Sequence, residues 1–149
     1  MDRINLDHIS GNPLHPEVKK AMISAIDADY GNPSSQHSMG DVATAVLDKA
    51  RESVARLINA SMPKEVIFTS SGTESVNHAI KGVVMANRDK GDHVIVSNIE
   101  HNAVNRSLKR LAGMGYRVTS VSVDGTGRVN VPEVEKAITD KTILISIMH

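Results

Sequence analysis

Small polar residues separate an apolar run from a segment of helical periodicity in the stretch FTSSGTESVNHAIKG, residues 68–82. Ser71 and Glu74 have the spacing of a capping box, in which the serine accepts from a backbone N–H and the glutamate reaches back. Gly72 would let the backbone approach a ligand closely, and Thr73 would add a hydroxyl donor, which suits a phosphate dianion. The local chemistry leaves both interpretations open, a plain helix cap and a phosphate site. Because the sequence has no GxGxxG and no GxxxxGK[ST], the phosphate is not that of a dinucleotide or a P-loop nucleotide.

A second chemical group is His101, in the stretch SNIEHNAV that follows another apolar run. A lone histidine is more often a cap or a structural hydrogen-bonding group than a catalyst. Beside a candidate phosphate turn, however, an imidazole could stack on a planar cofactor or shuttle a proton. We therefore favour the functional interpretation for His101.

The third stretch is YGNPSSQHSMG, residues 30–40, which is too rich in Gly, Pro, Ser and Asn to be a helix or a strand. Its hydroxyls and amides could contact a substrate. Ser38 could equally cap the helix that follows, and we prefer that interpretation.

Strand-like and helix-like segments alternate along the chain and would position these groups. Short runs rich in β-branched residues predict strands at 66–69, 93–97, 117–123 and 142–148. Apolar residues at helical spacing lie between the runs, and two further helices are predicted upstream, at 16–26 and over 43–58. This alternation predicts an α/β fold, a three-layer αβα arrangement with a mainly parallel sheet. In such a sheet, ligands lie outside the carboxyl ends of the strands, near helix N-termini.

The sequence also leads to two expectations about domain organisation. Residues 1–14 are expected to form an N-terminal segment that packs near the active site, and residues 15–149 the first part of a large cofactor-binding domain. Because ISIMH ends inside a predicted buried strand, we expect the 149 residues to be the N-terminal part of a larger protein. The alternative is a complete, non-catalytic module.

Composition excludes several classes of function. Seventeen Lys and Arg balance seventeen Asp and Glu, so we expect no nucleic-acid partner. No cysteine is present, which excludes a disulfide, a thiolate metal site and a cysteine nucleophile within these residues. The seven histidines show no HExxH spacing, so no metal site is predicted. Without a signal peptide or a long apolar run, we expect a cytoplasmic protein with no membrane contact.

The stretches FTSSGTESVNHAIKG, IEHNAV, YGNPSSQH and ISIMH, in this order and spacing, resemble the cysteine desulfurases of the class V aminotransferase group. The resemblance runs from about Leu6 to His149 and covers less than half of a family member. It implies a type I pyridoxal-phosphate fold and a homodimer with its active site at the subunit interface. It also implies that Gly72 and Thr73 hold the cofactor phosphate and that His101 stacks on the pyridine ring and takes part in proton transfer. The loop 32–37 matches a family segment near the active site.

The resemblance implies an activity for the complete protein: sulfur is taken from L-cysteine by way of an enzyme persulfide, and L-alanine is released. A sulfur-acceptor protein, as in iron–sulfur cluster assembly, would be a partner. The family's Schiff-base lysine, pyridine-pairing aspartate, substrate arginine and persulfide-forming cysteine would all lie beyond His149, so the 149 residues alone are expected to be inactive. The family commonly reads DNNATTPLDPEV where this chain has DHISGNPLHPEV, residues 7–18. That departure leaves open a related aminotransferase or lyase acting on another amino acid.

Overall fold

The structure is a computed structural model that describes residues 4–28 and 31–149. It divides into two compact units, Met1–Ile67 and Phe68–His149. Gly72, Thr73 and His101 all belong to the second unit.

The first unit is helical. It contains α1 (Pro16–Ile26), α2 (Ser38–Leu57) and the short 3₁₀ helix η1 (Pro63–Glu65). Proline stands in the first turn of α1, where its missing N–H costs nothing. Both helices predicted for this part of the chain are confirmed, and α2 buries Gly40, Ala43 and Ala55.

The loop before α2 is held by its own side chains. Asn32 Oδ1 accepts from Ser34 N at 2.9 Å, and Thr44 Oγ1 donates to Pro33 O at 2.7 Å. The N-cap of α2 is His37, whose Nδ1 accepts from Gly40 N, so the predicted cap at Ser38 is wrong by one residue. The reason is that the imidazole supplies the acceptor one position earlier. The first residue of the predicted loop stretch, position 30, lies outside the described residues.

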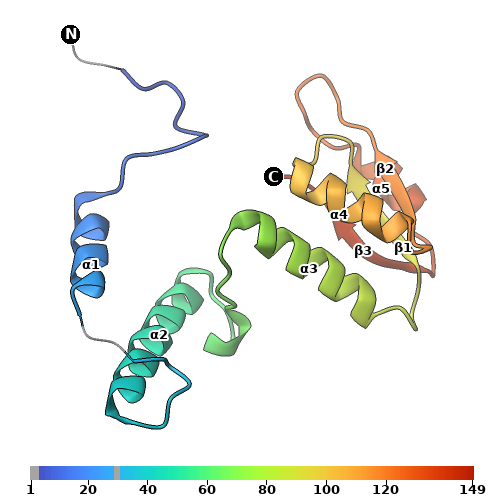
Figure 1. Cartoon of the computed structure of the whole chain (residues 1–149). Helices are drawn as coiled ribbons and strands as arrows, with labels where there is room; N and C mark the ends of the chain where they lie inside the picture. The colour runs from blue at the N-terminus through green and yellow to red at the C-terminus, as the bar shows by residue number, and fades with distance from the viewer. Residues whose placement is uncertain (1–3, 29–30) are drawn as a thin grey trace. The chain divides into compact units, whose positions relative to one another are not determined.

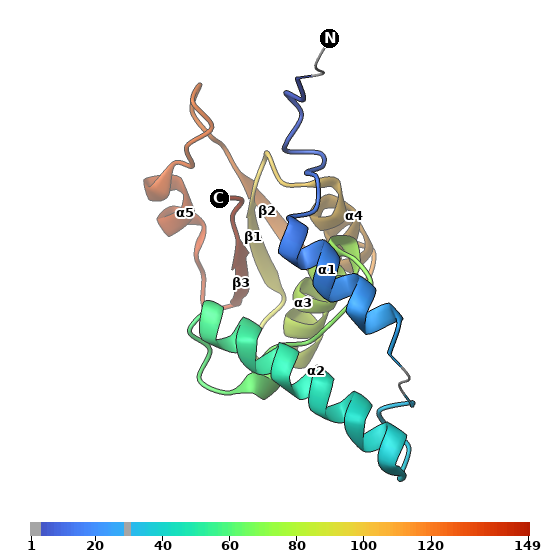
Figure 2. The same ribbon diagram turned by 90° about the vertical axis from the view of Figure 1, so that its left-hand side faces the viewer.

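The second unit is a parallel sheet with helices on both faces. Along the chain it contains α3 (Gly72–Ala86), β1 (His93–Ser97), α4 (Asn102–Ala112), β2 (Arg117–Val121), α5 (Val131–Ala137) and β3 (Thr142–Ser146). The strands lie in the order β2-β1-β3, all parallel. Helices α3 and α4 lie on one side of the sheet and α5 on the other (Figures 1 and 2). The predicted three-layer α/β arrangement is confirmed in this unit.

The core lies between the sheet and the helix pair α3 and α4. Val94 and Val96 of β1 pack against a cluster to which α3 contributes Ile80 and Val84 and α4 contributes Val104, Leu108 and Leu111. Every residue of β1 is buried because this strand is central and covered on both faces. The apolar residues at helical spacing in α4 face this core, and so do Val76 and Ile80 of α3, whereas Ala79 and Val83 of α3 are exposed.

The predicted strand at 66–69 is wrong. These residues form an irregular connection, and Ile67 and Phe68 are exposed by 61% and 47%. A strand needs a neighbour that completes its hydrogen-bond ladder. Among the described residues β1 already pairs with β2 and β3, and neither outer strand pairs with this run. The strands predicted at 117–123 and 142–148 exist but end two residues earlier, at Val121 and Ser146.

A buried histidine joins all three strands. His93 is 3% exposed; its Nδ1 lies 2.8 Å from Thr142 Oγ1 of β3 and its Nε2 lies 2.8 Å from Thr119 Oγ1 of β2. Burial lowers the pKa of His93 below its ordinary value of 6.5, and the nearby charge of Arg117 lowers it further. The folded chain therefore favours the neutral ring.

This lowered pKa predicts acid sensitivity. As the pH falls below about 6.5, the unfolded state binds a proton at His93 before the folded state does, so the free energy of unfolding decreases. The variant His93→Gln should lose part of this pH dependence, measured as the urea midpoint at pH 7.5 and pH 5. Replacing the exposed His78 by glutamine is the matched control and should leave the dependence unchanged. Equal pH dependence in both variants would contradict the prediction.

Candidate functional site

The first turn of α3 contains the serine half of a capping box, while the glutamate of the motif contacts a residue other than the N-cap. Ser71 is the N-cap, and its Oγ accepts from Glu74 N at 3.2 Å. The Glu74 carboxylate does not return to the N-cap amide. Its Oε2 accepts from Ser70 N at 2.7 Å and from Ser70 Oγ at 2.6 Å. The serine half of the predicted capping box is therefore present, whereas the glutamate contacts Ser70 instead of the N-cap residue.

The charge of Glu74 is stabilised by these contacts. The hydroxyl of Ser70 is the largest cause that lowers the pKa of Glu74, followed by the backbone N–H of Ser70. The carboxylate therefore stays ionised and keeps both Ser70 donors. Ser70 is consequently not available to a ligand at this turn.

Four donors remain at the start of α3. Within residues 4–28 and 31–149, the backbone N–H groups of Ser71, Gly72 and Thr73 and the hydroxyl of Thr73 have no hydrogen-bond partner. A Cβ placed on Gly72 would meet nothing within 4 Å, so the space in front of this turn is open. Free amides at a helix N-terminus, together with the positive end of the helix dipole, favour a bound anion. The turn has the donor set that a phosphate monoester needs.

His101 stands at the start of α4 as its N-cap. Its Nδ1 accepts from Ala103 N at 3.1 Å. Because a backbone N–H can only donate, the neutral ring must carry its proton on Nε2. The side chain is exposed, so one ring nitrogen serves the helix while the ring and Nε2 remain accessible.

Capping alone does not distinguish His101 from other histidines of the chain. His15 and His37 cap α1 and α2 in the same way, through a backbone N–H on Nδ1. What sets His101 apart is its place at the carboxyl end of β1, the central strand. The structural and the functional interpretations of His101 are therefore compatible.

Glu100 is a buried group beside His101 that sequence reasoning missed. It is 9% exposed, and its Oε1 accepts from Ser97 Oγ at 2.5 Å and from Met148 N at 2.6 Å. The same residue's carbonyl accepts from Asn105 Nδ2 at 3.0 Å. Glu100 thus joins the end of β1 to the segment after β3 and fixes the turn that leads into His101. Its partner Met148 is 48 residues away, so local sequence patterns gave no signal for this contact.

The starts of α3 and α4 lie at the same end of the helix pair. The chain runs from α3 directly into β1 and from β1 into α4, so both helices run opposite to the strand and parallel to each other (Figure 1). Ser107 Oγ donates to Asn77 Oδ1 at 2.9 Å. Asn77 and Ser107 are each five residues beyond the first residue of their helix, about 7.5 Å along the axis. Thr73 and His101 therefore lie at a common end, the carboxyl side of the sheet.

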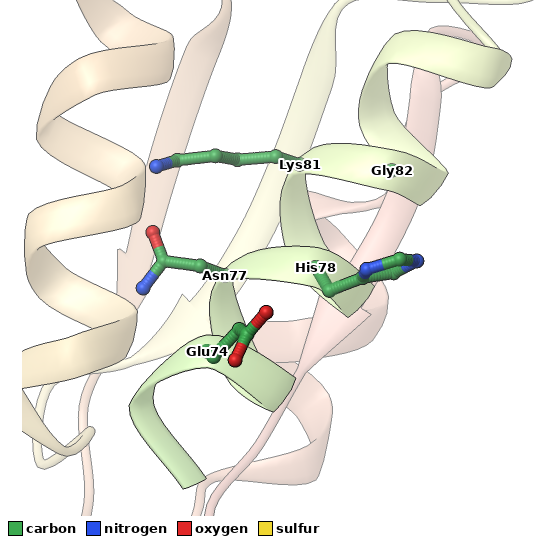
Figure 3. A pocket seen from close by; sticks show the side chains of 5 residues that line it. All are labelled: Glu74, Asn77, His78, Lys81 and Gly82. Atoms are coloured by element: carbon green, nitrogen blue, oxygen red, sulfur yellow. The ribbon is translucent and has the colours of Figure 1, made fainter. Parts of the chain in front are cut away.

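A shallow hollow of about 410 Å³ runs along α3, lined by Glu74, Asn77, His78, Lys81 and Gly82. Figure 3 shows that Asn77 and Lys81 extend in one direction and His78 in the other. The lining side chains do not converge on a common point. The hollow also follows the side of the helix rather than its N-terminal face, so the free donors at the start of α3 are not part of it.

The described part of the chain has neither a metal-binding cluster nor a membrane-spanning helix. Over residues 4–28 and 31–149, no three His, Asp or Glu side chains form a group that could hold a metal ion. None of the described helices is long and apolar enough to cross a membrane.

Comparison with known proteins decides the family. Residues 4–149 match the family model described as Aminotransferase class-V. The chain belongs to this family. It is 42% identical over 149 residues to "Putative cysteine desulfurase IscS 1" of Bacillus subtilis, and 43% identical over 145 residues to "Cysteine desulfurase IscS" of Methanosarcina thermophila.

Solved structures of class V relatives share the fold. A "NIFS-LIKE PROTEIN" superposes with a TM-score of 0.92 at 37% identity, and "SspA in complex with cysteine" with 0.86 at 33% identity. These alignments cover 99% and 95% of this chain and 40% of each structure. The chain likewise spans 39% and 36% of the Bacillus and Methanosarcina relatives. The predicted family and its fold are confirmed, and the chain corresponds to the N-terminal portion of these longer proteins.

Proposed function

We propose that this class V chain is the N-terminal part of a pyridoxal-phosphate-dependent cysteine desulfurase. In the complete protein, sulfur would be taken from L-cysteine and L-alanine released. The observation that carries the proposal is a match to named cysteine desulfurases at about 40% identity along the whole chain. One structural relative is named as a complex with cysteine, which supports the choice of substrate.

The start of α3 would hold the cofactor phosphate. The N–H groups of Gly72 and Thr73 and the hydroxyl of Thr73 are among the donors that the contacts of Ser71 and Glu74 leave unpaired. A phosphate with about two negative charges gains from the helix dipole as well as from these hydrogen bonds. The absence of a side chain at Gly72 keeps the approach to the backbone open.

His101 would lie against the cofactor ring and hold a proton at Nε2. Its Nδ1 is fixed by Ala103 N, which orients the ring and assigns the proton of the neutral form to the other nitrogen. When bound, pyridoxal phosphate supplies an electron sink for negative charge at the substrate's Cα. An imidazole at that place can accept a proton or return one.

Other parts of the proposal concern the complete protein. The family's Schiff-base lysine and nucleophilic cysteine would come from outside these 149 residues. We further propose a cytoplasmic homodimer that passes sulfur to an acceptor protein. Residues 1–14 would pack near the active site, as predicted from the sequence.

A second candidate function uses the same cofactor but a different amino-acid substrate. The stretch DHISGNPLHPEV departs from the family's common pattern, and its residues form a local turn in which Asn12 Nδ2 donates to His8 O at 3.0 Å. If this segment lies beside the substrate, the departure favours a related aminotransferase or lyase that acts on another amino acid.

Product analysis of the complete protein separates the two candidates. With pyridoxal phosphate bound, the protein is expected to convert L-cysteine to L-alanine and, in the presence of a thiol reductant, to release sulfide in equal amount. Other amino acids, supplied at the same concentration, should give no product. A protein that binds pyridoxal phosphate and forms no alanine from cysteine would contradict the desulfurase proposal and favour the second candidate.

A further inference from the structure

Asn77 connects the two helices whose starts carry the proposed site. The residue is half-buried on α3, and its Nδ2 donates to Thr73 O at 2.8 Å. Its Oδ1 accepts from Ser107 Oγ of α4 at 2.9 Å. One amide side chain therefore contacts both the proposed phosphate turn and the neighbouring helix.

The contacts continue from Ser107 to the start of α4. Ser107 is fully buried, and its hydroxyl also lies 2.9 Å from Ala103 O. Ala103 N is in turn the donor to His101 Nδ1 at 3.1 Å. Because a serine hydroxyl has one proton, Ser107 shares it between Asn77 Oδ1 and Ala103 O. The polar contacts connect Thr73 to His101 through Asn77, Ser107 and Ala103.

The contact to Ser107 is not needed to form α3. Asn87, at the other end of the same helix, makes the same contact to the carbonyl four residues earlier, from Nδ2 to Val83 O at 2.8 Å. Its Oδ1 accepts from Lys90 Nζ rather than from another helix. Asparagine is a poor helix former, and an apolar residue would pack equally well at a half-buried position between helices. The polar contact between the helices is therefore what sets Asn77 apart.

We propose that Asn77 is a positioning residue that holds the first turn of α3 in fixed register with the first turn of α4. In this role it sets the separation between the phosphate donors of Thr73 and the ring of His101. The inference rests on the proposed function, because the separation between Thr73 and His101 affects binding only if both residues contact one cofactor. The link itself exists without the cofactor and can be tested in the complete, cofactor-free protein.

The first test needs no cofactor. In the Asn77→Ala variant, the NMR signals of the His101 ring should shift, and the amide of Ser107 should exchange faster with solvent. Asn87→Ala is the matched control: it removes the same contact within α3 and should change neither observable. Ser107→Ala removes the partner of Asn77 on α4 and should cause the same shift of the His101 signals. Unchanged His101 signals in both Asn77→Ala and Ser107→Ala would overturn the inference.

The second test uses cofactor affinity in the complete protein. Asn77→Ala should raise the Kd for pyridoxal phosphate about three- to tenfold, as expected for one hydrogen bond, and leave the Kd for pyridoxal unchanged. The double variant with Ser107→Ala should lose no more than the larger of the single effects, because both changes break one link. Additive losses, or an equal loss in Asn87→Ala, would contradict the link. If the unaltered protein binds no pyridoxal phosphate, the proposed function fails, while the NMR test still decides the inference.

Discussion

Replacing Thr73 by valine is expected to raise the Kd of the complete protein for pyridoxal phosphate about 10- to 100-fold. Valine keeps the shape of the side chain and removes its hydroxyl, one of four donors left free at the start of α3. A hydrogen bond to a charged group contributes about 1.5–3 kcal/mol, which corresponds to this range. A spectrophotometric titration of the cofactor-free protein measures the effect.

Two controls separate phosphate binding from general damage at Thr73. The variant Thr73→Ser keeps the hydroxyl and should bind pyridoxal phosphate within a few-fold of the unaltered protein. Pyridoxal, which lacks the phosphate, should bind Thr73→Val as well as it binds the unaltered protein. An equal loss of affinity for both ligands would show that the hydroxyl does not contact the phosphate.

Replacing His101 by asparagine is expected to lower kcat for alanine formation about 10²- to 10⁴-fold, the usual contribution of a positioned acid–base group. Asparagine is among the best N-cap residues, so the cap on Ala103 N can be retained while the imidazole is lost. The free energy of unfolding should therefore stay within about 0.5 kcal/mol. Steady-state kinetics and urea unfolding of the same preparation measure both quantities.

The contrast between activity and stability makes the His101 variant informative. The exposed His78 of α3, replaced by asparagine, is the control and should leave both kcat and stability unchanged. A loss of stability with little change in kcat would mean that His101 is only a helix cap. A loss of kcat with unchanged stability supports its role beside the cofactor.

Local signals in the sequence were sufficient for the helices. Proline in the first turn marked α1, and the Ser71–Glu74 spacing marked the start of α3, because caps and turns are determined by neighbouring residues. The apolar spacing along α4 likewise identified the residues that pack on β1. His37 replaced Ser38 as a cap because an imidazole nitrogen can accept a backbone N–H as a hydroxyl does.

Contacts between distant residues could not be predicted in this way. The run at 66–69 has the composition of a strand, but a strand also needs a partner, and composition does not specify one. The contacts from Met148 to Glu100 and from Ser107 to Asn77 join residues 48 and 30 positions apart. The sequence thus identified the candidate ligand-binding groups, while the structure was needed to find the residues that hold them in place.

A crystal structure of the complete protein with pyridoxal phosphate bound is the most direct measurement of the central proposal. The phosphate oxygens are expected within hydrogen-bond distance, about 2.7–3.2 Å, of Gly72 N, Thr73 N and Thr73 Oγ1. The His101 ring is expected to lie against the face of the pyridine ring while its Nδ1 still accepts from Ala103 N. A phosphate bound away from the first turn of α3, or a His101 ring that does not contact the cofactor, would contradict the proposed site.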